Sequence, residues 1–163
     1  MKDGPRPEPE SLSPTAPLTP DQRIDLNRRW NQLAPMRHLG ARADFQDPAA
    51  VRIEIDPVLE HHRGGMGTEA INGAVISGLC DAAVGMVGFL HTQGRRAGTA
   101  QLNVVFLRPL LGDRAIATGR LTRAGTNLIF AAVEVTDERG TVCARCEGIV
   151  AVSGKGGVGR EAI

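Results

Sequence analysis

The chain has 163 residues, of which 42% are hydrophobic and 23% charged, and its formal net charge is +1. This length and composition are typical of one globular domain with its own core. The balanced charge excludes the basic surface that nucleic-acid binding needs. The aromatic content of 3%, with no tyrosine, removes the usual platform for stacked bases. We therefore expect no nucleic-acid partner.

The first residues, MKDGPRPEPE, place charges and prolines where a secretory signal needs an apolar core, which predicts a cytoplasmic protein. The three cysteines form an odd set, and thiols in the cytosol stay reduced, so we expect no disulfide bond. Six of the ten prolines fall within the first twenty residues. Such a composition cannot bury enough apolar surface to fold, so residues 1–18 are predicted to be a disordered tail.

A helix is predicted to begin after Thr19. The segment 19–22, Thr-Pro-Asp-Gln, combines an N-cap, a proline in the first turn and a glutamine placed for a capping box. Apolar residues then recur at roughly helical spacing and end before Pro35: Ile24, Leu26, Trp30 and Leu33. We expect this helix to cover the sheet.

Residues 51–55 alternate apolar and charged side chains, which is the pattern of a half-buried strand. The apolar run AINGAVISGLCDAAVGMVGFL, residues 70–90, is too long for an ordinary strand and predicts a helix. Because the run is apolar on every face, this helix should be buried on all sides. A membrane span is the alternative, but the run is short for one and holds a charge and several glycines. We expect the central helix of a soluble fold and no membrane partner.

Four strand-like stretches bounded by turn residues follow: 99–107, 114–123, 128–137 and 142–152. The predicted order is helix, strand, long apolar helix and four strands in an antiparallel meander, which defines an α+β domain over residues 19–153. One antiparallel sheet wrapped around the central helix satisfies this pattern. Residues 154–163 are predicted to be a flexible tail, because their GKGGVG sequence lacks the following helix that a phosphate-binding loop needs.

Cysteine and histidine residues outside the central helix are assigned structural roles. Cys143 and Cys146 lie three apart in a strand and should point to opposite faces, and no second Cys or His pair completes a metal site. We interpret His61 and His62 as solvated loop residues, with a place at a pocket rim as the alternative. His91 suits a cation at a helix C-terminus. No metal ion is expected.

Asp81 is the only formal charge between Ala70 and Leu90. A carboxylate buried among apolar residues is costly unless something compensates it, so Asp81 is predicted to have a functional role. One helical turn before it, Ser77 and Gly78 are small and leave space beside the carboxylate. Ser77 is therefore a candidate substrate contact.

The start of the central helix is the second part of the candidate site. Asn72 lies near the cap and Gly73 in the first turn, where free backbone N–H groups can hold an oxyanion. The alternative is that Asn72 only caps the helix. Eight residues separate Gly73 from Asp81, which is about 12 Å on a helix, so one helix cannot bring both to one carbonyl group. Two such helices running antiparallel across a two-fold axis can, which predicts a homodimer with shared sites.

The run NGAVISGLCDAAVG resembles the signature of hotdog-fold acyl-CoA thioesterases of the phenylacetic-acid-degradation (PaaI-like) type. In that signature a His-Gly-Gly helix start precedes an aspartate by the same spacing. Residues 99–148, with their Phe-Leu-Arg-Pro turn, resemble the family's later strands, and the similarity spans residues 35–152. The resemblance implies a hotdog fold, an acyl-CoA substrate, no cofactor, and a homodimer or a dimer of dimers, that is, a homotetramer.

The resemblance also implies roles for individual residues. Gly73 would supply the oxyanion-binding amide, and Asp81 of the partner subunit would activate water or attack the thioester carbonyl. Thr99 matches a position whose hydroxyl orients the carboxylate or the water. Asn72 stands where the family has histidine, and it can donate a hydrogen bond but cannot become cationic.

Further positions are implied for the substrate. Arg108, Arg123 and Gly125 lie in turns that family members use near the CoA phosphates and the pantetheine arm, and exposed turn residues are the alternative reading. The family's water-positioning residue falls at Met66. Its role would pass to a substrate-contacting residue nearby: Glu69, Thr99 or Asn103.

These residues predict a thioesterase that hydrolyses a small or medium acyl- or aryl-CoA thioester to the free acid and CoA. Two alternatives remain. One is an acyl-CoA-binding protein of the same fold without activity, because Asn72 and Met66 depart from the family pattern. The other is a hydratase or dehydratase, which ranks lower because no histidine lies within a helical turn of Asp81.

Overall fold

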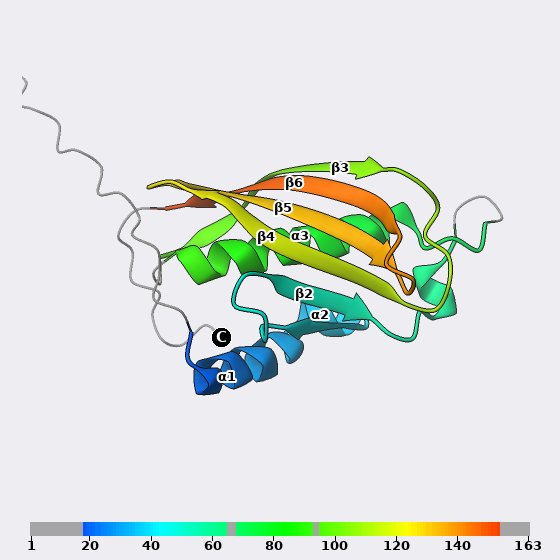
Figure 1. The fold of residues 1–163 in the computed structure, drawn as a ribbon, viewed down its shortest axis with the longest axis horizontal. Helices are drawn as coiled ribbons and strands as arrows, with labels where there is room; N and C mark the ends of the chain where they lie inside the picture. The colour runs from blue at the N-terminus through cyan, green and yellow to red at the C-terminus, as the bar shows by residue number, and fades with distance from the viewer. Residues whose placement is uncertain (1–17, 65–67, 93–94, 154–163) are drawn as a thin grey trace, which may run out of the picture.

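The computed structural model of the chain describes residues 18–64, 68–92 and 95–153 (Figure 1). The helical elements are α1 (Pro20–Asn31), α2 (Ala34–His38), the 3-10 turn η1 (Glu60–His62) and α3 (Gly73–His91). The strands are β1 (Ala41–Asp44), β2 (Val51–Ile55), β3 (Ala97–Phe106), β4 (Ala115–Ala124), β5 (Leu128–Asp137) and β6 (Val142–Val152). The two predicted tails, apart from Leu18, lie outside the described residues.

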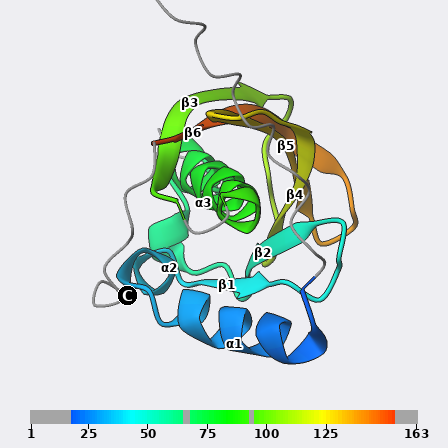
Figure 2. The ribbon, with the colours of Figure 1, turned by 90° about the vertical axis from the view of Figure 1, so that its left-hand side faces the viewer.

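The six strands form one antiparallel sheet in the order β1-β2-β4-β5-β6-β3. Figure 2, which looks along α3, shows the sheet curving around this helix. The prediction of an α+β hotdog domain, with an antiparallel sheet wrapped around a long apolar helix, is confirmed. A sheet that curves around one helix buries both the inner sheet face and most of the helix surface.

The prediction of a four-stranded meander is wrong for its first strand. β4, β5 and β6 are joined by hairpins, but β3 pairs with β6, with Phe106 opposite Ala144, and not with β4. The chain therefore crosses from one edge of the sheet to the middle after β3. At this crossing the backbone N–H groups of Leu107 and Arg108 both donate to the carbonyl of Cys143. Sequence alone does not reveal this pairing, because strand periodicity carries no information about the neighbouring strand.

Glycines allow α3 to approach β6 closely. A Cβ added at Gly148 in β6 would lie 2.5 Å from Val84 of α3, and one added at Gly88 in α3 would lie 2.7 Å from Val150 of β6. Neither site has room for a side chain. The glycines of the central helix therefore include one, Gly88, that packs against the helix's own sheet.

In the single chain α3 is not buried on every side, because one sheet leaves part of the helix surface uncovered. Most of the helix packs into the core, but Ala74, Asp81 and Phe89 are exposed along one face. We call this the open face of α3. By length and composition α3 alone would pass for a membrane span, yet 44% of its most apolar window is buried inside the fold. The core contact settles its role as the central helix of this domain.

Helix α1 lies along the free edge of β1 and has no buried residue, so the prediction that it covers the sheet needs correction. Its predicted capping box at Thr19 is present. One polar face of the helix reaches the strand: Asn31 bonds both the N–H and the carbonyl of Ala43, Asn27 accepts from the N–H of Phe45, and Arg23 donates to the carbonyl of Phe45. Residues four apart on a helix share a face, which explains this spacing. The apolar stripe was visible in the sequence, but this polar stripe determines where α1 lies.

Candidate functional site

Asn72 is the N-cap of α3, as predicted. Its side-chain oxygen accepts a hydrogen bond of 2.8 Å from the N–H of Ala74, and its side-chain nitrogen donates to the carbonyl of Gly64 at 3.3 Å. Both ends of the amide therefore have partners within the fold. The structure supports the capping role of Asn72, with the amide holding the loop before α3 against the helix start.

The backbone N–H of Gly73 has no acceptor among the described residues. Gly73 is the first residue of α3, so this N–H points out of the helix end with the partial positive charge of the helix dipole. The ring of Phe106, at the end of β3, lies against the glycine: a Cβ at position 73 would lie 3.3 Å from its Cζ. The site is thus a free amide flanked by an aromatic ring that is 52% exposed.

His62 contacts the start of α3 through its backbone. The interpretation of His62 as a solvated loop residue is wrong. His62 is buried, its backbone carbonyl accepts from the N–H of Asn72, and its Nδ1 accepts from the N–H of Leu59. Burial lowers the pKa of its imidazole, with a smaller contribution from His61, so the neutral form is favoured. His61 is exposed, and its ring lies 3.9 Å from that of His62, centroid to centroid.

Asp81 lies midway along the open face of α3. It forms no hydrogen bond or ion pair with any described residue, so the fold itself does not compensate its charge. In the single chain the carboxylate is exposed, which corrects the expectation that it is buried. Apart from the adjacent residues and the backbone of the helix itself, no atom of the described residues lies within 4 Å of a Cβ placed at Gly85, one turn further on. The carboxylate therefore faces open space.

A cavity of about 500 Å³ opens beside Asp81, between α2, α3 and the start of β3. Asp81 and Thr99 both line it, so the structure brings these two predicted catalytic residues to one site. Its walls are mainly apolar and include side chains from α1, α2 and the segment joining them: Trp30, Leu33, Met36 and Leu39. A volume of this size is in the range of small-molecule pockets. The cavity can hold an apolar group next to a carboxylate.

The other predicted substrate contacts are dispersed. Ser77 is half-buried on α3 and Asn103 is exposed on β3, and neither lines the cavity. Glu69 is exposed in the loop before α3, and only its backbone carbonyl makes a described contact. Met66 lies outside the described residues.

The three predicted CoA-binding residues lie at opposite ends of the chain's sheet. Arg108 follows β3, at the end where α3 begins. Arg123 and Gly125 lie at the turn between β4 and β5, at the end where α3 finishes. Arg95, which follows α3, donates to the carbonyl of Thr126 in this turn. One chain therefore does not assemble these residues into one site, just as it does not bring Gly73 to Asp81.

Two buried thiols lie in the core between α3 and β6. Cys80 of α3 and Cys146 of β6 are buried and free, and the neighbouring Cys146 thiol together with burial raises the pKa of Cys80. Cys143 is also buried and free. Among the residues that the structure describes, no group of three or more His, Cys, Asp or Glu side chains has the arrangement of a metal site.

His91 is half-buried, and burial lowers its pKa, so the prediction of a cation at the end of α3 is not supported.

The cavity walls are what sequence reasoning missed. In the sequence Trp30 is part of an apolar helical stripe, and the segment that forms α2 and β1 carries no clear helix or strand pattern. The one available signal was that the chain's only tryptophan lies on this stripe. No local sequence pattern indicates that His62 is buried, because its burial depends on the packing of η1 against residues far away in the chain.

Comparisons with known proteins agree with this fold. Residues 69–144 match the family model of the Thioesterase superfamily. These residues include the start of α3, Asp81 and Thr99. A comparison with curated proteins found no match.

Solved structures of similar fold are thioesterase-related. A protein from Shewanella oneidensis related to the thioesterase superfamily is 22% identical with a TM-score of 0.73, over 82% of this chain and 96% of that one. A thioesterase from Haemophilus influenzae is 18% identical with a TM-score of 0.72, over 87% and 94%. The PaaI protein of E. coli, from the phenylacetic acid degradation operon, is 20% identical with a TM-score of 0.67, over 81% and 94%.

At these identities the structural matches show the fold, and the family model adds the relationship in sequence. Together they confirm the resemblance to hotdog-fold thioesterases. The chain has the hotdog fold, and its residues 69–144 are similar to the Thioesterase superfamily.

Proposed function

We propose that this protein is an acyl-CoA thioesterase that uses Asp81 as its catalytic carboxylate. The observation that carries the proposal is that Asp81 and Thr99 line one apolar cavity of about 500 Å³. The cavity takes the acyl group, a small or medium acyl or aryl chain, and Asp81 faces the thioester carbonyl. An exposed carboxylate without a partner in its own fold is available for this chemistry.

The complete site requires a second copy of the chain. The open face of α3 leaves apolar surface uncovered, and the free edge of β3 exposes Val105 and Phe106. Pairing two copies across a two-fold axis covers both surfaces and brings Asp81 to the partner subunit's Gly73. The same operation brings Arg123 and Gly125 toward the partner subunit's Arg108. A homodimer, or a dimer of dimers, thus brings together the catalytic residues and the CoA-binding residues that one chain keeps apart.

The proposed reaction is hydrolysis. A water oxygen forms a bond to the acyl carbon, the C–S bond breaks, and CoA leaves as a thiol after taking up a proton. Asp81 either takes the proton from the water or attacks the carbonyl to form an anhydride that water then opens. The Gly73 N–H stabilises the negative charge on the carbonyl oxygen, and Thr99 orients the water or the carboxylate. Arg108, Arg123 and Gly125 bind the CoA portion.

The test is the variant Asp81→Asn, assayed for thiol release from aromatic, short and medium acyl-CoAs. Because Asp81 has no hydrogen-bond or ion-pair partner among the described residues, we expect an unchanged melting temperature. Loss of the carboxylate should lower kcat by about 10²–10⁴-fold. Wild-type turnover by a folded Asp81→Asn protein would disprove the assignment.

A non-catalytic acyl-CoA-binding protein is the second candidate. The observation that favours it is that both ends of the Asn72 amide are occupied by bonds within the fold, so Asn72 is not free to polarise a thioester. Binding of acyl-CoA without thiol release across the same panel would support this candidate.

A hydratase or dehydratase is the third candidate. His38 of α2 lines the same cavity as Asp81, which gives this reaction a histidine that the sequence did not indicate. Hydration of an enoyl-CoA, lost in both Asp81→Asn and His38→Gln, would support it over hydrolysis.

A further inference from the structure

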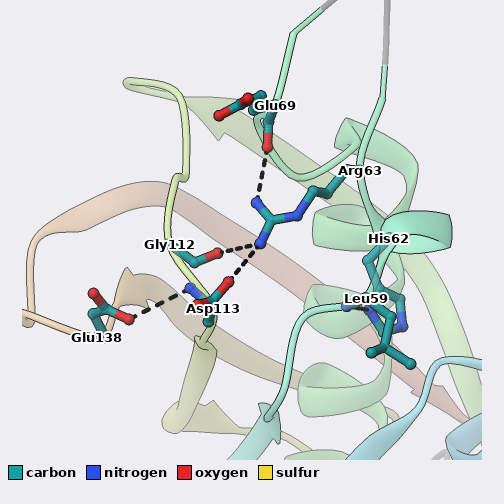
Figure 3. Close-up of polar contacts among 7 residues, drawn as sticks. All are labelled: Leu59, His62, Arg63, Glu69, Gly112, Asp113 and Glu138. Carbon is teal, nitrogen blue, oxygen red and sulfur yellow. Dashed lines mark hydrogen bonds and ion pairs between the residues drawn. The ribbon is translucent and has the colours of Figure 1, made fainter.

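The loop that leads into α3 is fastened by one side chain, that of Arg63 (Figure 3). Its Nη1 donates to the backbone carbonyl of Glu69 at 2.9 Å. Its Nη2 donates to the backbone carbonyl of Gly112 and to a carboxylate oxygen of Asp113, both at 2.8 Å. The guanidinium therefore connects two segments of the chain: the loop before α3 and the connection from β3 to β4.

Arg63 stands where this loop closes. The backbone of Arg63 forms a β-bridge with Ile71, and the N–H of Gly64 donates to the carbonyl of Ala70. Ile71 and Asn72 follow directly, and the next amide is the free N–H of Gly73. The side chain of Arg63 is 24% exposed, and its hydrogen bond to the carbonyl of Gly112 is partly buried. Any movement of the loop base is transmitted to the helix start within a few residues.

The acceptor side of this contact is fixed to the sheet. The carbonyl of Asp113 accepts from the N–H of Val58, its own N–H donates to the carboxylate of Glu138, and the carbonyl of Leu110 accepts from the N–H of Ile71. The connection between β3 and β4 thus forms a scaffold shared by the loop before α3 and by the hairpin from β5 to β6. Figure 3 shows Arg63 placed between Glu69 on one side and Gly112 and Asp113 on the other.

The geometry calls for arginine specifically. A planar guanidinium can donate in several directions at once, whereas an ammonium group is a point charge on a flexible stem. Two of the three acceptors are backbone carbonyls, so the contact does not depend on the side chains of Glu69 or Gly112. The ion pair contributes little on its own, because Asp113 is 83% exposed. The structural role therefore lies in the hydrogen bonds to the carbonyls.

We propose that Arg63 is a positioning residue for the oxyanion-binding amide of Gly73. It acts by holding the base of the loop, so that the helix start keeps its place relative to the scaffold. This inference rests on the proposed function, because it assigns a purpose to the Gly73 N–H. A misplacement of about 1 Å in a reacting geometry can cost 10²-fold in rate.

The kinetic experiment compares Arg63→Gln and Arg63→Lys with the wild-type dimer. We expect kcat to fall about 10- to 100-fold in Arg63→Gln, less in Arg63→Lys, with KM within about 3-fold of wild type. Arg145→Gln is the matched control, because Arg145 forms an ion pair with Glu134 at 3.1 Å on the exposed side of the sheet, away from α3. A rise in KM at unchanged kcat would overturn the proposal, since it would indicate direct contact with the CoA phosphates.

Amide hydrogen exchange provides a readout that does not depend on activity. In Arg63→Gln we expect the hydrogen-bonded amides of Ile71, Asn72 and Ile76 to exchange at least about 10-fold faster, while those of β5 keep their wild-type rates. Equal acceleration in β5 would mean global destabilisation and would overturn a local role. Wild-type rates at Ile71, Asn72 and Ile76 would also overturn it. If the wild-type protein hydrolyses no acyl-CoA, the proposed function fails, and the exchange rates alone still decide whether Arg63 holds the helix start.

Discussion

Trp30 of α1 meets Phe89 of α3 edge to face, with ring centroids 5.8 Å apart and planes at 79°. Both residues line the cavity beside Asp81. The contact joins the helix that borders β1 to the open face of the central helix, so α1 forms part of the wall of the proposed acyl site. Aromatic pairs of this geometry are stabilised beyond their buried area.

Trp30→Ala should therefore lengthen the cavity and shift its preference toward longer acyl chains. One methylene in an apolar pocket changes binding by about 1–3 kcal/mol, so we expect the ratio of kcat/KM for dodecanoyl-CoA to that for hexanoyl-CoA to rise at least 10-fold. Leu26→Ala is the control, since Leu26 packs against the core from the same helix but does not line the cavity. Equal ratios in the two variants would contradict the prediction.

Shared sites predict complementation between two inactive variants. A heterodimer of Asp81→Asn and Gly73→Val chains has one site with both changes and one site with neither. We expect purified heterodimers, selected with two different tags, to keep about half of the wild-type activity per dimer, and both homodimers to be nearly inactive.

If both residues of a site came from one chain, every site in the heterodimer would carry one change. The heterodimer would then be as inactive as its parents, and this result would contradict the shared-site geometry. The Gly73→Val homodimer also needs a melting temperature near wild type, because the added side chain meets only the exposed ring of Phe106.

Burial of His62 predicts a loss of stability in mild acid. The pKa of this imidazole is lowered in the folded chain, so below its ordinary value of about 6.5 the unfolded chain binds a proton that the folded chain does not. The free energy of unfolding should therefore fall as the pH drops below about 6.5. Urea unfolding at pH 7.5 and pH 5.5 measures the difference, and His62→Gln should reduce it. His91, whose pKa is also lowered by burial, accounts for part of what remains.

The close approach of α3 to β6 predicts that Gly88→Ala and Gly148→Ala overpack the core. Each added methyl group would lie within 3 Å of a valine side chain. We expect each change to lower the free energy of unfolding by about 1–3 kcal/mol, measured with urea. Gly85→Ala is the comparison on the same helix, because no atom of its own chain lies near the added carbon. If Gly85→Ala proves costly, size-exclusion chromatography should show that the loss accompanies dissociation of the dimer.

Local signals in the sequence predicted much of this molecule. Asn72 and Gly73 marked the start of α3 correctly, because capping depends on a few adjacent residues. The alternation of apolar and polar residues located β2 and the last three strands. The hotdog fold followed from these elements and from the family resemblance.

Nonlocal packing accounts for what the sequence did not reveal. The four-residue strand β1 has charged residues at two of its positions and is too short for a periodic signal. The pairing of β3 with β6, the burial of His62 and the hydrogen bonds of Arg63 join residues far apart in the chain, and no local pattern encodes such contacts. Of the candidate site, the sequence brought out Asp81, Thr99 and Gly73, while the cavity walls became visible only in the fold.

The polar stripe of α1 also determines how copies of this chain can assemble. Asn27, Asn31 and Arg23 occupy the backbone groups of Ala43 and Phe45 that a foreign strand would otherwise use. The sheet therefore has one sealed border and one open border, at β3. In the proposed dimer, two chains join at their β3 strands, which pairs both open borders and leaves a sealed border at each end of the combined sheet. Growth of the sheet stops at two chains, so the arrangement that completes the proposed site also protects the protein from endless strand-by-strand association.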